Sequence, residues 1–166
     1  MIKELPSETL SFWSAFLLQS GRPIETRPFE IFAFDDHAES ADRLAALVLE
    51  GRKSATASLL WEYDFPDKRP PLAGDLSIVT NWAKKPVCVI ETTRIRIRSF
   101  EEVDEAFASA EGEGDSTLKQ WRDDHWAYFG RVCAKLGRER SRTMPVVCER
   151  FKVVYVPGKV GMNGLG

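Results

Sequence analysis

The sequence has few cysteines and almost no net charge, and each shortage excludes a class of protein. Its three cysteines, Cys88, Cys133 and Cys148, are odd in number, far apart and set in apolar runs. They form neither a disulfide framework nor a CxxC metal site, so we expect buried free thiols in a reducing compartment. A formal net charge of -2 gives no global positive field for a long DNA duplex, so any nucleic acid must be bound locally.

Long hydrophobic runs are also absent. No stretch approaches the length of a membrane span, and Lys3 and Glu4 are followed by no apolar signal-peptide core. We therefore expect a cytoplasmic protein that contacts no membrane. With 166 residues, 43% of them hydrophobic, the chain can bury one sizeable core. We expect one domain over residues 1–157 and a disordered tail at 158–166.

The periodicity of apolar residues predicts an α+β protein. Helical spacing predicts helices within residues 7–21, 37–51, 100–112 and 115–137, with Ser7 as an N-cap and Gly51 as a left-handed C-cap. Alternation predicts strands within 54–63, 76–82, 86–100 and 146–156. Since the strands are not separated by regular helical crossovers, we expect a small, mostly antiparallel β-barrel with flanking helices.

Two glutamates break the apolar pattern of their strands. Alternation places Glu91 and Glu149 each among side chains suited to a core. A desolvated carboxylate has a raised pKa and is a candidate proton donor. The alternative for Glu91 is that it caps a buried hydrogen-bond network or pairs with a basic side chain. For Glu149 it is an ion pair with Arg52, Arg122 or another basic residue.

A stripe of hydroxyls follows the second helix. In an extended chain Ser54, Thr56 and Ser58 point the same way, and Lys53 lies three residues before Thr56. If the chain turns between them, a desolvated lysine with a lowered pKa can act as the base toward a hydroxyl nucleophile. The alternative is that Lys53 only benefits from the negative end of the preceding helix.

Basic and aromatic side chains offer contacts for nucleic acid. Arg94, Arg96 and Arg98 alternate along one strand and form a basic stripe for phosphates, or a solvated face that protects an edge strand. Trp61 and Tyr63 are suited to stacking on a base, or are ordinary barrel aromatics.

His125 and an acidic loop are weaker candidates. His125 lies on the packed side of its helix, four residues after Trp121, where a hydrogen-bonded core histidine is commoner than a catalyst. The loop 111–115 carries three carboxylates, of which Glu111 and Asp115 are candidate ligands for a divalent ion. Its spacing matches no calcium loop, so we interpret it as a solvated acidic loop.

Five segments together resemble the ASCH domain family, whose fold is PUA-like. They are GRKSATASLLWEY at 51–63, GDLSIV at 74–79, PVCVIETT at 86–93, EGEGDSTLKQWRDDHWAYF at 111–129 and MPVVCERFKVVY at 144–155. The resemblance implies RNA binding or RNA metabolism. Some members resemble amidohydrolases of N-acylated cytidine that need no cofactor, and their catalytic positions match Lys53, Thr56 and Glu91. Longer members are linked to metal-dependent RNA cleavage, where Glu111 or Asp115 would hold the ion.

Three functions stay open at this point. The first is binding of RNA or an RNA-derived nucleoside in a barrel-side cleft, with ribonuclease-like hydrolysis. The others are hydrolysis of acylated cytidine and RNA binding without catalysis. Eight further residues are candidate RNA or nucleoside contacts: Arg52, Ser54, Ser58, Trp61, Tyr63, Arg122, His125 and Glu149.

Overall fold

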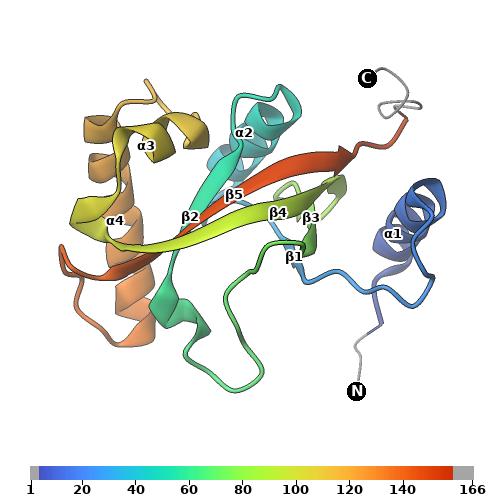
Figure 1. Ribbon diagram of the computed structural model, residues 1–166, viewed down its shortest axis with the longest axis horizontal. Coiled ribbons are helices and arrows are strands. Elements are labelled where there is room, and N and C mark those ends of the chain that lie inside the picture. Colours follow the sequence, from blue (N-terminus) through green and yellow to red (C-terminus); the bar gives the residue numbers. More distant parts are fainter. Residues whose placement is uncertain (1–3, 159–166) are drawn as a thin grey trace. The chain divides into compact units, whose positions relative to one another are not determined.

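The computed structural model describes residues 4–158, and the predicted tail lies outside them except for Gly158. The helices are α1 (Ser7–Ser20), α2 (Ala38–Leu49), α3 (Glu105–Glu111) and α4 (Leu118–Leu136) (Figure 1). The strands are β1 (Glu30–Phe32), β2 (Ala55–Leu59), β3 (Leu76–Thr80), β4 (Pro86–Ser99) and β5 (Pro145–Tyr155). Short 3-10 helices follow β2, at Leu60–Tyr63, and β4, at Phe100–Glu102.

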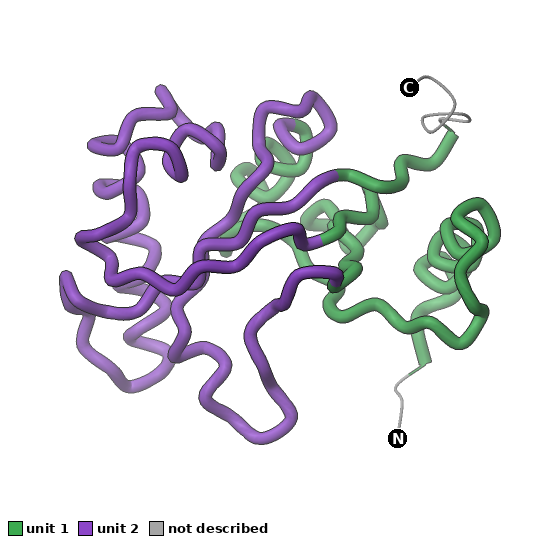
Figure 2. The backbone as a smooth tube through the Cα atoms, in the orientation of Figure 1, with its two compact units in different colours: residues 1–46, 75–91, 153–166 green, residues 47–74, 92–152 purple. Residues whose placement is uncertain are grey.

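The chain forms two compact units, shown in different colours in Figure 2. The first contains residues 1–46, 75–91 and 153–166, and the second contains residues 47–74 and 92–152. β4 and β5 each pass from one unit into the other. Each unit has its own group of buried hydrophobic residues.

The strands make a mixed sheet, which confirms the predicted α+β class. In the first unit the order is β1-β3-β4, with β1 parallel to β3 and β3 antiparallel to β4. In the second unit the order is β4-β5-β2, and β2 runs antiparallel to β5. The predicted strand 54–63 is wrong in its second half. There the Glu62 carboxylate accepts the N–H of Leu59 at 2.7 Å, and the chain turns into a 3-10 helix.

In the first unit, α1 covers β3 and the start of β4. Trp13, Phe16 and Leu17 recur at helical spacing and pack on Ile78 and Val89, all of them buried. The predicted N-cap is wrong, because Ser7 is the first helical residue and Pro6 holds the N-cap position. The side chain of proline has no acceptor for a capping hydrogen bond.

In the second unit, α3 and α4 pack against one face of β2 and β5. The buried residues of this core include Ala55, Leu59, Phe107, Trp121, Phe129, Val146 and Cys148. Asp104 caps α3 by accepting the N–H of Phe107 at 2.9 Å, and Thr117 caps α4 by accepting the N–H of Gln120 at 3.1 Å. The chain between the two helices, which carries the acidic loop, therefore begins at Gly112, the left-handed C-cap of α3, and ends at the Thr117 cap of α4.

All three cysteines are buried and free, as predicted. Within residues 4–158, no helix has both the length and the apolar character needed to cross a membrane.

Candidate functional site

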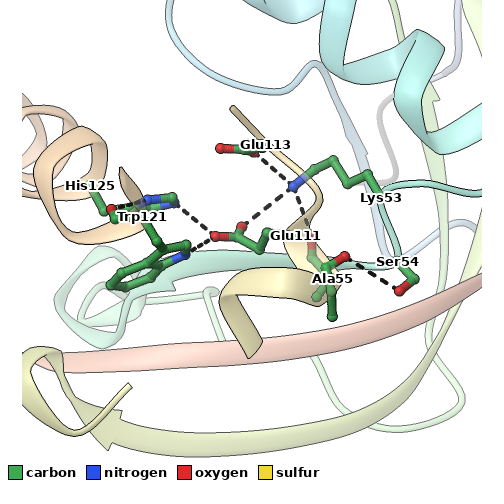
Figure 3. Close-up of polar contacts among 8 residues, drawn as sticks. Lys53, Ser54, Ala55, Glu111, Glu113, Trp121 and His125 are labelled. Carbon is green, nitrogen blue, oxygen red and sulfur yellow. Dashed lines mark hydrogen bonds and ion pairs between the residues drawn. The ribbon is translucent and has the colours of Figure 1, made fainter. Parts of the chain in front are cut away.

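A buried ion-pair network surrounds Lys53 in the second unit. Lys53 follows α2, and its ammonium nitrogen lies 2.7 Å from the carbonyl oxygen of Ala55, 2.9 Å from Glu113 Oε1 and 3.4 Å from Glu111 Oε1 (Figure 3). All three are oxygen acceptors, which suits an ammonium group because it can only donate. Lys53 is 2% exposed and Glu111 is 1% exposed. The network is therefore closed to solvent except at Glu113.

His125 completes this network from α4. Its Nε2 lies 3.0 Å from Glu111 Oε2, and its Nδ1 lies 2.9 Å from the carbonyl oxygen of Trp121. Both partners are acceptors, so the ring must carry a proton on each nitrogen. Burial alone would lower the pKa of His125, but the charge and hydrogen bond of Glu111 raise it above the usual value. The Trp121 indole donates to Glu111 and stacks on the His125 ring at 4.1 Å.

The electrostatics of Lys53 contradict the lowered pKa that was predicted for it. Burial favours the neutral amine, but the charges of Glu111 and Glu113 outweigh it and raise the pKa of Lys53. Burial likewise disfavours the Glu111 carboxylate, yet His125 and Lys53 lower its pKa to about 2. Both groups are therefore charged at neutral pH.

The acidic loop is less exposed to solvent than predicted. Glu111 is the last residue of α3 and is buried, so the interpretation as a solvated loop is wrong for this residue. Asp115 is exposed, and its Oδ1 accepts from the Thr117 hydroxyl at 2.6 Å and from the Thr117 N–H at 2.9 Å. The two candidate ligands therefore lie in different environments, Glu111 inside the protein and Asp115 at its surface.

Polar side chains gather on the face of β2 and β5 opposite to Ala55 and Leu59. Thr56 is paired with Glu149 in the register of the two strands, and the Thr92 hydroxyl donates to Glu149 at 2.7 Å. Ser58 and Tyr63 join their hydroxyls at 2.8 Å. Thr56, Ser58, Tyr63, Thr92 and Glu149 form what we call the hydroxyl face. It contains most of the predicted hydroxyl stripe.

Lys53 and Ser54 do not belong to this face. Lys53 bonds toward α3, on the Ala55 side of β2, whereas alternation places Thr56 on the other side. The predicted turn between Lys53 and Thr56 is absent, because the chain is already extended from Ala55 onward. Ser54 is exposed, with its hydroxyl 3.4 Å from the carbonyl oxygen of Ala110.

Glu91 lies in the first unit, and its side chain is 27% exposed. A guanidinium nitrogen of Arg22 lies 3.8 Å from Glu91 Oε1. The prediction of an apolar face around it is wrong, because Thr93 and Ile97, which share that face, are exposed. The alternative interpretation, pairing with a basic side chain, is confirmed. Its catalytic role stays a prediction.

The other predicted contact residues have local partners. The guanidinium of Arg138 covers the ring of Trp61 at 4.6 Å. Arg122 donates to the carbonyl oxygen of Glu101 at 3.2 Å. Arg52 is exposed beside Gly112, whose backbone contacts the Arg52 carbonyl.

A pocket of about 220 Å³ lies in the second unit, and we call it the arginine pocket. Its lining includes Arg94, Arg96 and Arg98 from β4, Arg150 from β5, and Asp104 and Phe107 at the start of α3. The stripe on β4 was predicted, but Arg150 was not. Among the described residues none of these four arginines forms an ion pair. Cys148 also contributes to the lining, and burial raises the pKa of its thiol to about 12, so it stays uncharged.

The ASCH domain family model matches residues 30–155. The chain belongs to the ASCH domain family. A solved ASCH domain from Lactobacillus crispatus is 35% identical, with a TM-score of 0.83 over 93% of this chain and 98% of that one. Protein EF3133 from Enterococcus faecalis is 31% identical, with a TM-score of 0.83 over 90% of each chain. Hypothetical protein PH0355, 17% identical with a TM-score of 0.50 over 75% of this chain and 97% of that one, shows likeness of fold alone. No curated protein matches significantly.

This ASCH domain brings Glu111, Glu113 and His125 close enough to share a metal ion, but their chemistry does not fit one. The Lys53 ammonium already lies between the two carboxylates and would repel a divalent cation. The Nε2 atom of His125 must carry a proton to donate to Glu111, which removes it as a ligand. The ammonium of Lys53 therefore occupies the place between the two carboxylates that a metal ion would need.

Sequence reasoning missed Arg150 and Glu113. Glu149 breaks the apolar pattern on one face of β5, whereas Arg150 lies on the other face with Cys148. Glu113 stands between Gly112 and Gly114, both with positive φ angles. Glycines on both sides of one carboxylate indicate a tight turn, and the sequence Gly112-Glu113-Gly114 already contains this pattern.

Proposed function

We propose that this ASCH domain binds RNA, with the arginine pocket as its phosphate contact. The observation that carries the proposal is the convergence of Arg94, Arg96, Arg98 and Arg150 on one pocket without internal ion pairs. Like charges held close together raise the free energy of the folded protein, and a bound anion removes that cost. Guanidinium groups bind phosphate oxygens with two parallel hydrogen bonds, which favours phosphate as the anion.

The hydroxyl face supplies a second contact of a different kind. Hydroxyls donate and accept, and the Glu149 carboxylate accepts, so together they suit base edges and the 2′-hydroxyl of ribose. The face is only partly buried, since Thr56, Ser58 and Glu149 each retain some exposure. A local basic pocket in a chain of net charge -2 favours a single strand over a long duplex.

Removing charge from the pocket should weaken RNA binding and reduce its salt dependence. For single-stranded RNA, the slope of log affinity against log salt is about -0.7 for each neutralised phosphate. Replacing Arg94 and Arg96 by glutamine should lower affinity roughly tenfold or more and flatten that slope by about one. Fluorescence anisotropy of a labelled short RNA across a series of salt concentrations measures both quantities.

Lys119→Gln is the matched control for this experiment. The side chain of Lys119 is 89% exposed on α4 and forms an ion pair with Asp123 at 3.2 Å. Its replacement by glutamine removes one positive charge outside the pocket. Its affinity and salt slope should stay close to those of the unmodified protein. An equal loss in the control and the arginine variants would show non-specific attraction and would contradict the proposal.

Hydrolysis is the second candidate function, and the pairing of Thr56 with Glu149 favours it. Directly opposed side chains in an antiparallel pair have Cβ atoms about 5 Å apart, so this carboxylate can accept the proton of an attacking Thr56 hydroxyl. The predicted base, Lys53, is protonated and buried in the ion-pair network. We therefore propose Glu149 for that role, toward acylated cytidine or RNA.

Turnover assays separate the hydrolytic alternatives. Protein with acetylated cytidine should release acetate in the presence of chelator, and Thr56→Val should slow this by about 100-fold or more. Glu149→Gln should give a loss of similar size. RNA cleavage that stops with chelator would instead support a metal-dependent ribonuclease. Absence of turnover with either substrate, while RNA still binds, would overturn hydrolysis and leave a binding module.

A further inference from the structure

We infer that the arginine pocket holds the terminal phosphate monoester of an RNA strand rather than an internal phosphodiester. This inference rests on the proposed RNA binding and names the part of the RNA that the pocket recognises. Its support comes from the charge of the pocket, its size and its walls.

The charge of the pocket exceeds what one phosphodiester neutralises. Four arginines and one aspartate line it, which leaves three positive charges in excess. A phosphodiester carries one negative charge, whereas a phosphate monoester carries about 1.5 to 2 near pH 7. The monoester therefore removes more of the repulsion among the guanidiniums.

Within residues 4–158, the four arginines of the pocket form no ion pair with a carboxylate. Arg22 and Arg138, in contrast, lie near the carboxylates of Glu91 and Asp64, at 3.8 and 3.3 Å. Arg150 makes a contact of another type, in which its guanidinium lies 6.0 Å from the centre of the Phe107 ring. All the N–H donors that face the pocket are therefore available to phosphate oxygens, and a monoester offers three of these oxygens where a diester offers two.

The size and walls of the pocket favour a strand end. Its volume of about 220 Å³ is below the roughly 300–1,000 Å³ typical of sites for whole drug-sized ligands. It holds a phosphate and its sugar better than a complete nucleotide. Residues of β4, β5 and the start of α3 line it.

Asp104 limits the pocket to a single phosphate. Its carboxylate is held in place because Oδ1 accepts the N–H of Phe107 at 2.9 Å. A fixed negative charge beside the arginines repels a second phosphate, which an internal stretch of RNA would bring with it. The ring of Phe107 forms an apolar wall suited to the carbon face of a ribose.

Short RNAs that differ only at their ends test this inference. We would compare a labelled RNA bearing a 5′-phosphate, the same RNA with a 3′-phosphate, and the same RNA with hydroxyls at both ends. One phosphorylated form should bind about tenfold or more tightly than the hydroxyl form. Arg150→Gln and Arg98→Gln should each remove that preference, while Lys119→Gln should keep it. Circular dichroism melting of each variant identifies any loss caused by misfolding.

The outcomes distinguish this inference from RNA binding itself. Equal affinity for all three RNAs, lowered equally by the arginine variants, would overturn the terminal phosphate and leave RNA binding intact. No binding of any RNA at low salt would overturn the proposed function. A free nucleoside monophosphate that competes as well as the phosphorylated RNA would overturn the strand end as the ligand.

Discussion

Replacing Gly112 by alanine should destabilise the protein by about 2–5 kcal/mol. Gly112 ends α3 with φ +67°, a left-handed conformation that costs an L-residue about 1–2 kcal/mol. A Cβ atom there would also overlap the carbonyl oxygen of Arg52, so the backbone of Arg52 would have to move. Overpacking of this kind costs about 1–3 kcal/mol more. Urea unfolding followed by circular dichroism measures the change in free energy.

Gly137→Ala is the matched control, because it isolates the close contact from the conformational cost. Gly137 ends α4 with φ +68°, almost the same angle, and a Cβ atom there would meet nothing within 4 Å. Its alanine variant should lose only about 1–2 kcal/mol. Equal losses in the two variants would show that the contact with Arg52 has no energetic consequence.

The close approach at Gly112 explains how the ion-pair network is assembled. The N–H of Ser54 donates to the carbonyl oxygen of Ala110 at 2.8 Å, so the end of α3 is bonded to the chain that follows α2. Only a residue without a side chain fits between them. This contact brings Glu111 under the ammonium of Lys53, and without it the two charges would not meet.

Local patterns predicted the four helices and the strands β2 to β5, because those patterns reflect burial along one helix or strand. They did not predict β1, which has only three residues. The alternation of Thr56 and Ser58 predicted the hydroxyl face, and the spacing of Trp121 and His125 predicted the buried side of α4. The caps were predicted less well, since a shift of one residue, as at Ser7, changes which side chain holds the position.

The partners of each charge were not predictable from local patterns. Glu111 and Glu113 lie 58 and 60 residues after Lys53, and nothing around Lys53 indicates them. Burial alone predicts a lysine with a lowered pKa, and only the contacts with Glu111 and Glu113 reverse the direction of the shift. The resemblance to the ASCH family supplied the fold, but it did not supply the side-chain contacts that decide the chemistry.

Replacing Lys53 by methionine should destabilise the protein by roughly 3–5 kcal/mol. Methionine keeps the length and the apolar stem of lysine, so the main loss is the ammonium that offsets Glu111 and Glu113. Removing one partner of a buried ion pair leaves an uncompensated charge, and the cost is of this size. Lys119→Met, which breaks an exposed pair with Asp123, should cost less than about 0.5 kcal/mol.

Urea unfolding of the same variants at several pH values shows whether the charges of the network cause the loss. Because the pKa of Glu111 is lowered from 4.5 to about 2 by folding, its stabilisation is complete above pH 4.5 and disappears as the pH falls toward 2. The gap between the unmodified protein and Lys53→Met should therefore narrow over that interval. Adding Glu111→Gln to Lys53→Met should recover part of the loss at pH 6, because it removes the uncompensated carboxylate. A gap that stays constant from pH 6 to pH 2 would mean that methionine disturbs packing rather than charge, and that the network does not stabilise the fold electrostatically.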